Sequence, residues 1–224
     1  MKLYELAYAC RLYQSQYDPA YREMRNALGE HPTLDSEAQR GALLRFLNEW
    51  GCRIPESPTL KDRIREWAAV WVPQLPGAAR DIGSLNDAEL TLIGNAYDQL
   101  LKLGAGLHFQ DTAAAKTLHA LRIRLLPMWD AAIMNRFRQR GSSNRTGGQT
   151  YADFIRDVAE QISELEADAA RLGYSLAEVA DLVQGCNGPL VKLVDEYNWV
   201  TITGKHAIPT SEDLERWLSW VARP

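Results

Sequence analysis

The sequence predicts an almost entirely α-helical fold, and three observations support this. Apolar residues recur at three- and four-residue steps along most of the 224-residue chain, which is the spacing of one helix face. Capping residues and glycine or proline stops bound these apolar runs. Only the short segment that begins at Trp199 alternates in the manner of a strand. We therefore expect an all-α fold with at most one short strand or hairpin near residues 199–208.

Four helices are expected before residue 122, and each has a recognisable start. The predicted starts are Ser36, Pro58, Ser84 or Asn86, and Asp111 or Thr112. Gly51 ends the first helix, the second ends before Pro73, and the third ends at Gly104. This part of the chain is therefore predicted to consist of amphipathic helices joined by short connections.

The remainder of the chain is predicted to contain one long helix and several short ones. A helix opens at Pro127, and residues 141–148, which include no apolar side chain, are expected to form a loop. An apolar stripe over residues 151–172 predicts the longest helix. Shorter helices are expected at 175–183, at 189–197 and after Thr210 or Ser211.

Length and composition are those of an ordinary soluble protein with one large or two small domains. No apolar run reaches the roughly 18 residues that a membrane span needs, and Glu5 lies where a signal peptide would be apolar. We therefore expect a cytoplasmic protein without a membrane partner. Cys10, Cys52 and Cys186 form no C-x-x-C pair, so we expect no disulfide framework, zinc knuckle or iron–sulfur cluster. The four histidines show no metal-ligand spacing, and we expect no metal site and no cofactor.

The net charge of −4 is unevenly distributed along the chain. Residues 1–111 and 151–224 are acidic, whereas residues 112–150 carry a single acid, Asp130, among seven basic residues. Those basic residues are Lys116, Arg122, Arg124, Arg136, Arg138, Arg140 and Arg145. A basic centre between acidic flanks is typical of a protein with one polyanion-binding surface. We expect a helical region 1–148 that carries a basic candidate active-site segment, 104–145, and an acidic helical region 149–224 that packs on it.

The most informative pair of residues is Lys116 and Asp130. The lysine lies on one apolar helix and the carboxylate at the start of the next, 14 residues further on. Asp130 is either an acid that satisfies backbone donors at a helix start or the acid of a functional site. The two side chains are equally compatible with a structural ion pair. A carboxylate on a polyanion-binding surface repels the polyanion. Its presence among basic residues therefore favours a functional role for Asp130.

Lys116, Pro127 and Asp130 resemble, in order, the catalytic lysine, proline and catalytic aspartate of the helix-hairpin-helix superfamily of DNA glycosylases. The resemblance covers about 30 of the 224 residues. It implies a two-lobed helical fold and an enzyme that flips a damaged or modified base out of duplex DNA and excises it. Asp130 would be the catalytic carboxylate, and Lys116 a nucleophile or a phosphate contact. The family's hairpin glycines are not adjacent to Lys116, so a water mechanism is favoured over a lyase.

Elementary chemistry gives the same roles. Breaking a base–sugar bond builds positive charge on the sugar, which a carboxylate stabilises while it orients a water molecule. An unprotonated lysine could attack the sugar carbon instead. A flipped base needs an aromatic pocket, for which Trp129 is the nearest candidate, with His119 as a supporting residue or a structural one. The expected contacts to the DNA backbone are Arg122, Arg124, Arg136, Arg138, Arg140 and Arg145.

Two further interpretations stay open. A bulky modified base, such as those that some phages place in their DNA, would suit a member of the family with a role in antiviral defence. Alternatively, the chain is a non-catalytic helical module that binds nucleic acid or a protein partner. The polar and aromatic run from Asp195 to Trp199 is either a second functional loop or the start of a strand.

Overall fold

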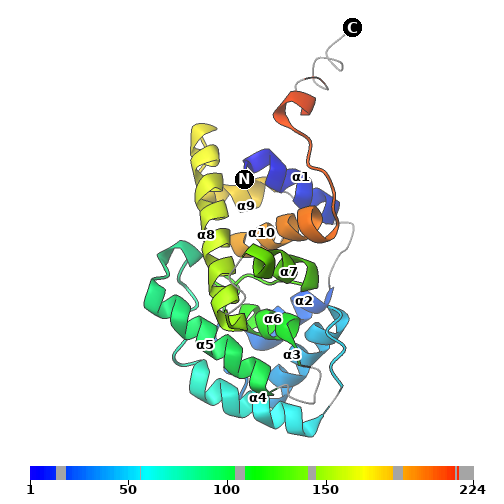
Figure 1. Cartoon of the computed structure of the whole chain (residues 1–224), viewed down its shortest axis with the longest axis vertical. Helices are drawn as coiled ribbons and strands as arrows, with labels where there is room; N and C mark the ends of the chain where they lie inside the picture. Colours follow the sequence, from blue (N-terminus) through cyan, green and yellow to red (C-terminus); the bar gives the residue numbers. More distant parts are fainter. Residues whose placement is uncertain are drawn as a thin grey trace.

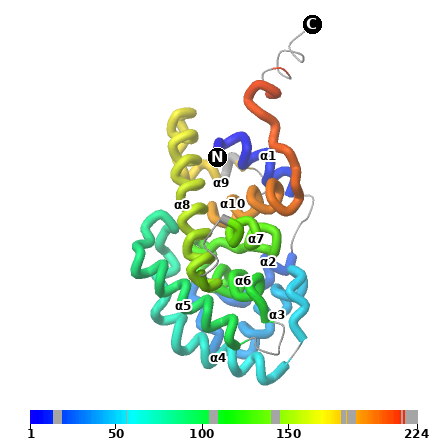
Figure 2. Tube along the Cα trace, viewed as in Figure 1, coloured from blue at the N-terminus to red at the C-terminus, as the bar shows by residue number. Residues whose placement is uncertain are grey.

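The computed structural model describes residues 1–13, 19–55, 57–103, 109–140, 145–183, 189–214 and 216. These residues form helices and connections without any strand (Figures 1 and 2). The elements are α1 (Leu3–Tyr13), α2 (Pro19–Leu28), α3 (Glu37–Glu49), α4 (Pro58–Trp71), η1 (Ile82–Ser84), α5 (Asp87–Leu103), α6 (Asp111–Leu121), α7 (Ala131–Arg140), α8 (Gly147–Arg171), α9 (Leu176–Leu182), α10 (Leu190–Asn198) and η2 (Trp199–Thr203). The all-helical prediction is confirmed for this part of the chain.

The strand expected near residues 199–208 is wrong. Trp199–Thr203 form a single turn of π-helix, η2, that continues directly from α10. The Gly204 N–H donates to the Trp199 carbonyl oxygen, which closes that turn. The alternation of side chains that suggested a strand is too short to distinguish the two structures. Single π-turns are frequent at functional sites.

Several helix starts follow the capping signals of the sequence. The Ser36 hydroxyl accepts the Gln39 N–H at the start of α3, and Ser57 with Pro58 opens α4. Two starts differ from the prediction. Helix α7 begins at Ala131, four residues after Pro127, and α8 begins at Gly147, because Thr146 and Gln149 form a reciprocal capping box. Gly147 and Gly148 are therefore helical, although they were expected to lie in a loop.

The long helix α8 organises the fold. Figure 1 shows it running beside α5 and past α10. At the crossing with α5 the two backbones touch through Gly94 and Gly148, where a Cβ atom on Gly94 would lie 2.8 Å from the Gly148 carbonyl oxygen. Only glycine lets two helices approach this closely. The predicted boundary between regions 1–148 and 149–224 thus falls in the first turn of α8.

One hydrophobic core extends across that boundary. It contains residues of α2 to α7 together with Tyr151, Phe154 and Val158 of α8 and Val194 of α10. A smaller cluster joins α1 to the far end of α8, to α9 and to α10. The arrangement brings the ends of several helices to one place, between α10 and the connection from α6 to α7.

Candidate functional site

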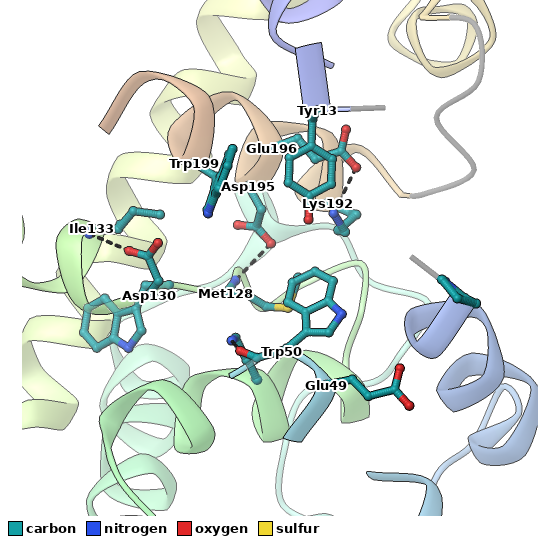
Figure 3. Close-up of a pocket in the computed structure, with 13 residues that line it drawn as sticks. Tyr13, Glu49, Trp50, Met128, Asp130, Ile133, Lys192, Asp195, Glu196 and Trp199 are labelled. Carbon is teal, nitrogen blue, oxygen red and sulfur yellow. Dashed lines mark hydrogen bonds and ion pairs between the residues drawn. The ribbon is translucent and has the colours of Figure 1, made fainter. Parts of the chain in front are cut away.

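A pocket of about 480 Å³ lies where these ends meet (Figure 3). Its walls come from α1, α2, α3, α6, the α6–α7 connection, α7, α10 and η2. The lining residues are Tyr13, Pro19, Glu49, Trp50, Lys116, Met128, Trp129, Asp130, Ile133, Lys192, Asp195, Glu196 and Trp199. This volume suits a small-molecule ring system.

Asp130 lies at the edge of the pocket, at the amino end of α7. Its Oδ1 accepts the N–H groups of Ala132 and Ile133, both at 2.9 Å. Its Oδ2 accepts the hydroxyl of Thr203, on η2, at 2.6 Å. Asp130 therefore caps α7 and ties η2 to it, and it also lines the pocket. These contacts hold the carboxylate in one orientation.

Lys116 lies on the α6 wall of the same pocket and is buried. Its Nζ donates to the carbonyl oxygen of Trp50 at 2.6 Å and lies 5.3 Å from the centroid of that indole ring. The amine is thus engaged with the C-terminal end of α3, where exposed carbonyl groups attract a cation.

Helix α10 contributes a buried ion pair. Lys192 Nζ lies 2.9 Å from Glu196 Oε1, one helical turn further along. The same ammonium lies 4.5 Å from the centroid of the Tyr13 ring and 5.3 Å from that of Trp50. Burial by itself would lower the pKa of Lys192, but Glu196 and Tyr13 outweigh it and raise that pKa above its ordinary value. The lysine is therefore a fixed positive charge.

Asp195, between those two residues in the sequence, is the most unusual group of the pocket. Its Oδ2 accepts the Met128 N–H at 3.0 Å. Its Oδ1 is buried and has no hydrogen-bond partner among the described residues. Burial raises the pKa of Asp195 well above its ordinary value, and Glu196 adds to the shift, although Met128 and Lys192 oppose it.

The two supporting residues expected from the sequence differ in their positions. Trp129 lines the pocket and packs edge-on against Tyr97 and Tyr151. His119 is not among the lining residues of the pocket. Its Nδ1 contacts the Leu126 carbonyl oxygen at 2.7 Å and therefore carries the proton, so Nε2 accepts the Tyr21 hydroxyl at 2.9 Å. Burial lowers the pKa of His119 to about 3, so the ring is neutral and structural.

Arg122 was expected to contact DNA, but its side chain is buried. The guanidinium donates to the carbonyl oxygens of Val72, Pro76 and Leu121. Arg122 thus satisfies carbonyl groups at the end of α4 and in the segment that follows it. Its role in the structure is internal, and it is unavailable to a phosphate.

Of the remaining arginines, Arg124, Arg136, Arg138 and Arg145 are exposed, and three of these have acidic partners. Arg124 pairs with Asp81 at 3.3 Å and Arg138 with Asp111 at 2.7 Å, while Arg145 pairs with Asp153. Arg136 is exposed on α7. The side chain of Arg140, like His108 and residues 141–144, lies outside the described part of the chain. Acids that lie outside residues 112–150 therefore pair with three of the arginines inside this range.

Sequence reasoning missed the contributions of α1 and α3 to the pocket. Nothing near Tyr13 or Trp50 in the sequence marks them as functional. The run from Asp195 to Trp199 had been noted, although as a loop or a strand start; it belongs to α10 and η2. A usable signal was the presence of three charged residues in the otherwise apolar segment that includes Val191 and Val194.

Comparisons of the chain with protein-family models, with curated proteins and with solved structures gave no match. Within the described ranges, no group of three or more His, Cys, Asp or Glu side chains is arranged to hold a metal ion. No helix in those ranges combines the length and apolarity that crossing a membrane requires.

Proposed function

We propose that the pocket binds a nucleobase and that the protein hydrolyses the N-glycosyl bond of a damaged or modified base in DNA. The observation that carries this proposal is that Asp130, Lys116 and Trp129, all singled out from the sequence, line one pocket. Aromatic rings, including Trp50 and Trp199, supply flat apolar surface for a base. The volume of about 480 Å³ leaves room for a base and part of its sugar.

Asp130 supplies the chemistry in this proposal. Its charge would stabilise the positive charge that develops on the sugar as the base departs, and its carboxylate would orient the attacking water. The hydrogen bonds from Ala132, Ile133 and Thr203 fix the carboxylate in advance, so little reorganisation is needed during the reaction. Lys116 donates to the Trp50 carbonyl oxygen, which favours water over the amine as the nucleophile.

The substitution Asp130→Asn tests the proposal. Asparagine caps helices about as well as aspartate, so the melting temperature and the affinity for duplex DNA should stay close to those of the wild type. The loss of negative charge should slow base release by roughly 100- to 1000-fold. The measurement is single-turnover release from duplexes that carry a panel of damaged and modified bases.

The matched control is Asp62→Asn, because Asp62 is an exposed aspartate on α4 outside the pocket. This variant should release bases at the wild-type rate. Full activity of Asp130→Asn on a substrate that the wild type cleaves would remove Asp130 from the mechanism.

The second candidate is a non-catalytic module that binds nucleic acid or a protein. It is favoured by the fact that Asp130 already has a complete structural role, because it caps α7 and accepts the Thr203 hydroxyl. Under this alternative the wild type releases no base from any duplex of the panel, while it still binds a partner.

A further inference from the structure

The buried carboxyl of Asp195 is the strongest unexplained feature of the molecule. Buried polar atoms almost always have a hydrogen-bond partner, and an orphaned one typically destabilises the fold. Asp195 is 5% exposed, and its Oδ1 has no partner among the described residues, although its Oδ2 accepts the Met128 N–H. Figure 3 shows the carboxyl projecting from α10 into the space beside Trp199. Such an atom is suited to a ligand contact.

Several charged and titratable groups face Asp195. Lys192 and Glu196 flank it on α10, and Tyr151 of α8 and Tyr21 of α2 interact with it electrostatically. Tyr13, Lys116 and Asp130 line the same pocket from α1, α6 and the start of α7. Lys192 is already paired with Glu196. The negative charge of Glu196 therefore offsets much of the attraction between Lys192 and an ionised Asp195. Burial then favours the neutral acid, consistent with the raised pKa of Asp195.

We propose that Asp195 is the proton donor of the pocket: its Oδ1 carries a proton, donates it to an acceptor nitrogen of the bound ring, and transfers it to the base as the base departs. This inference rests on the proposed function. The C1′–N bond breaks, and its electron pair goes to the base, which takes the Asp195 proton. The water oxygen bonds to C1′, and the water proton passes to Asp130. That proton is then released, and Asp195 is reprotonated from solvent.

The environments of the two carboxyl groups fit this division of labour. Asp130 accepts three hydrogen bonds from the described residues, so both of its oxygens act as acceptors. Asp195 accepts a single N–H and is enclosed by protein. Pairs of carboxyl groups in contrasting environments are a recurrent way to provide an acid and a base in one site. Because Oδ1 is covered, the proposal requires the wall of the pocket beside Asp195 to move locally when a ring binds.

The decisive test uses two leaving groups and the substitution Asp195→Asn. Asparagine can still accept the Met128 N–H and donate a hydrogen bond to the ring, but it cannot transfer a proton. Release of hypoxanthine, a neutral base, should slow by roughly 100-fold. Release of 7-methylguanine, which is already cationic, should change less than about threefold, because its departure needs no proton. Asp62→Asn is the control, with no effect on either base.

Equal losses for both bases, or no loss for either, would overturn the role of Asp195 while the Asp130→Asn result still supports base excision. A second measurement does not depend on activity. The infrared spectrum of the wild type near neutral pH should contain the C=O band of a protonated carboxyl that is missing from Asp195→Asn. If that band is absent from the wild type, Asp195 is ionised and the inference is wrong, even if the wild type releases no base.

Discussion

At the scale of single residues, Lys116 distinguishes the two mechanisms that are open to the proposed base excision. Its amine donates to the Trp50 carbonyl oxygen at 2.6 Å, and an amine held in this way is a poor nucleophile. Borohydride should therefore trap no covalent adduct between the protein and DNA. Lys116→Met should retain measurable base release, although it leaves a carbonyl group unpaired and destabilises the fold by about 1–3 kcal/mol. Adduct formation is measured by gel electrophoresis at a temperature at which the variant is folded.

The control is Lys102→Met, which removes an exposed lysine on α5. An adduct that forms with the wild type and with Lys102→Met, but not with Lys116→Met, would establish Lys116 as the nucleophile.

His119 makes the stability of the protein depend on pH. Burial lowers the pKa of His119 to about 3 in the folded state, against an ordinary value of 6.5. Its contribution is complete above pH 6.5 and is lost as the pH falls toward 3, because only the unfolded chain then takes up the proton. The stability advantage of the wild type over His119→Gln should therefore shrink by about 1.4 kcal/mol per pH unit in this window. Urea unfolding at several pH values measures the difference.

The control for the histidine-to-glutamine change itself is His31→Gln, which replaces an exposed imidazole outside the core. A constant difference between the wild type and His119→Gln from pH 6.5 to 4 would show that His119 titrates normally in the folded protein.

The sequence singled out residues of the pocket where the proposed chemistry requires a particular side chain. Asp130 and Lys116 stood out as a lone acid and a lysine near it, and they share the pocket. The burial of a side chain cannot be predicted from its residue type, because it depends on the residues that pack around it in the fold. His119 and Arg122 were therefore assigned to the site or the surface, although both are buried. The orphaned oxygen of Asp195 depends on the packing of α10 and could not be predicted.

At the scale of helices, the crossing of α5 and α8 depends on two glycines. A Cβ atom on Gly148 would collide with the backbone of Gly94, so Gly148→Ala must push the helices apart. We expect a loss of about 1–3 kcal/mol of unfolding free energy, which is the usual effect of overpacking. Thermal unfolding monitored by circular dichroism measures it.

Gly83→Ala is the matched control, since a Cβ atom at Gly83 would have no neighbour within 4 Å. It should leave the melting temperature nearly unchanged. If Gly148→Ala is as stable as Gly83→Ala, the close approach of α5 and α8 is not required for the fold.

Helix starts were predictable where the signal is local. A hydroxyl at Ser36 or a proline at Pro58 acts on its own first turn, and α3 and α4 begin there. The start of α7 was predicted at Pro127, four residues before the observed start at Ala131. Proline is common both in the first turn of a helix and in the connection that precedes one. The π-turn at Trp199 contacts α1 and α7. The local sequence around Trp199 does not indicate these tertiary contacts.

At the scale of the whole molecule, the basic centre of the sequence is not a single basic surface. Arg124, Arg138 and Arg145 each pair with an acid from another segment. A count along the chain detects the excess of positive charge, but only the tertiary fold shows where acids offset it. Under the proposed function, DNA affinity should consequently depend on few arginines and only moderately on salt.

The double substitution Arg136→Gln with Arg138→Gln tests this. If both side chains contact phosphates, the slope of log affinity against log salt concentration should fall by about 0.9 per lost contact on duplex DNA. The reduction should be the same for all DNA sequences, because phosphate contacts carry no base information. Fluorescence anisotropy at several salt concentrations gives the slope.

Arg11→Gln with Arg45→Gln removes two exposed arginines elsewhere on the molecule and should leave the slope unchanged. If the two double variants have the same slope, the DNA-binding surface does not include α7.

The wall of the pocket is assembled from residues as distant in the sequence as Tyr13 and Trp199. An unfolded chain does not gather such residues, so a compound that fits the pocket binds only the folded protein. Its binding free energy is then added to the stability of the whole fold, by about 2.7 kcal/mol when its concentration is one hundred times its dissociation constant. Occupancy of this pocket thus couples α1 and α10 thermodynamically, because both helices must be folded for the ligand to stay bound.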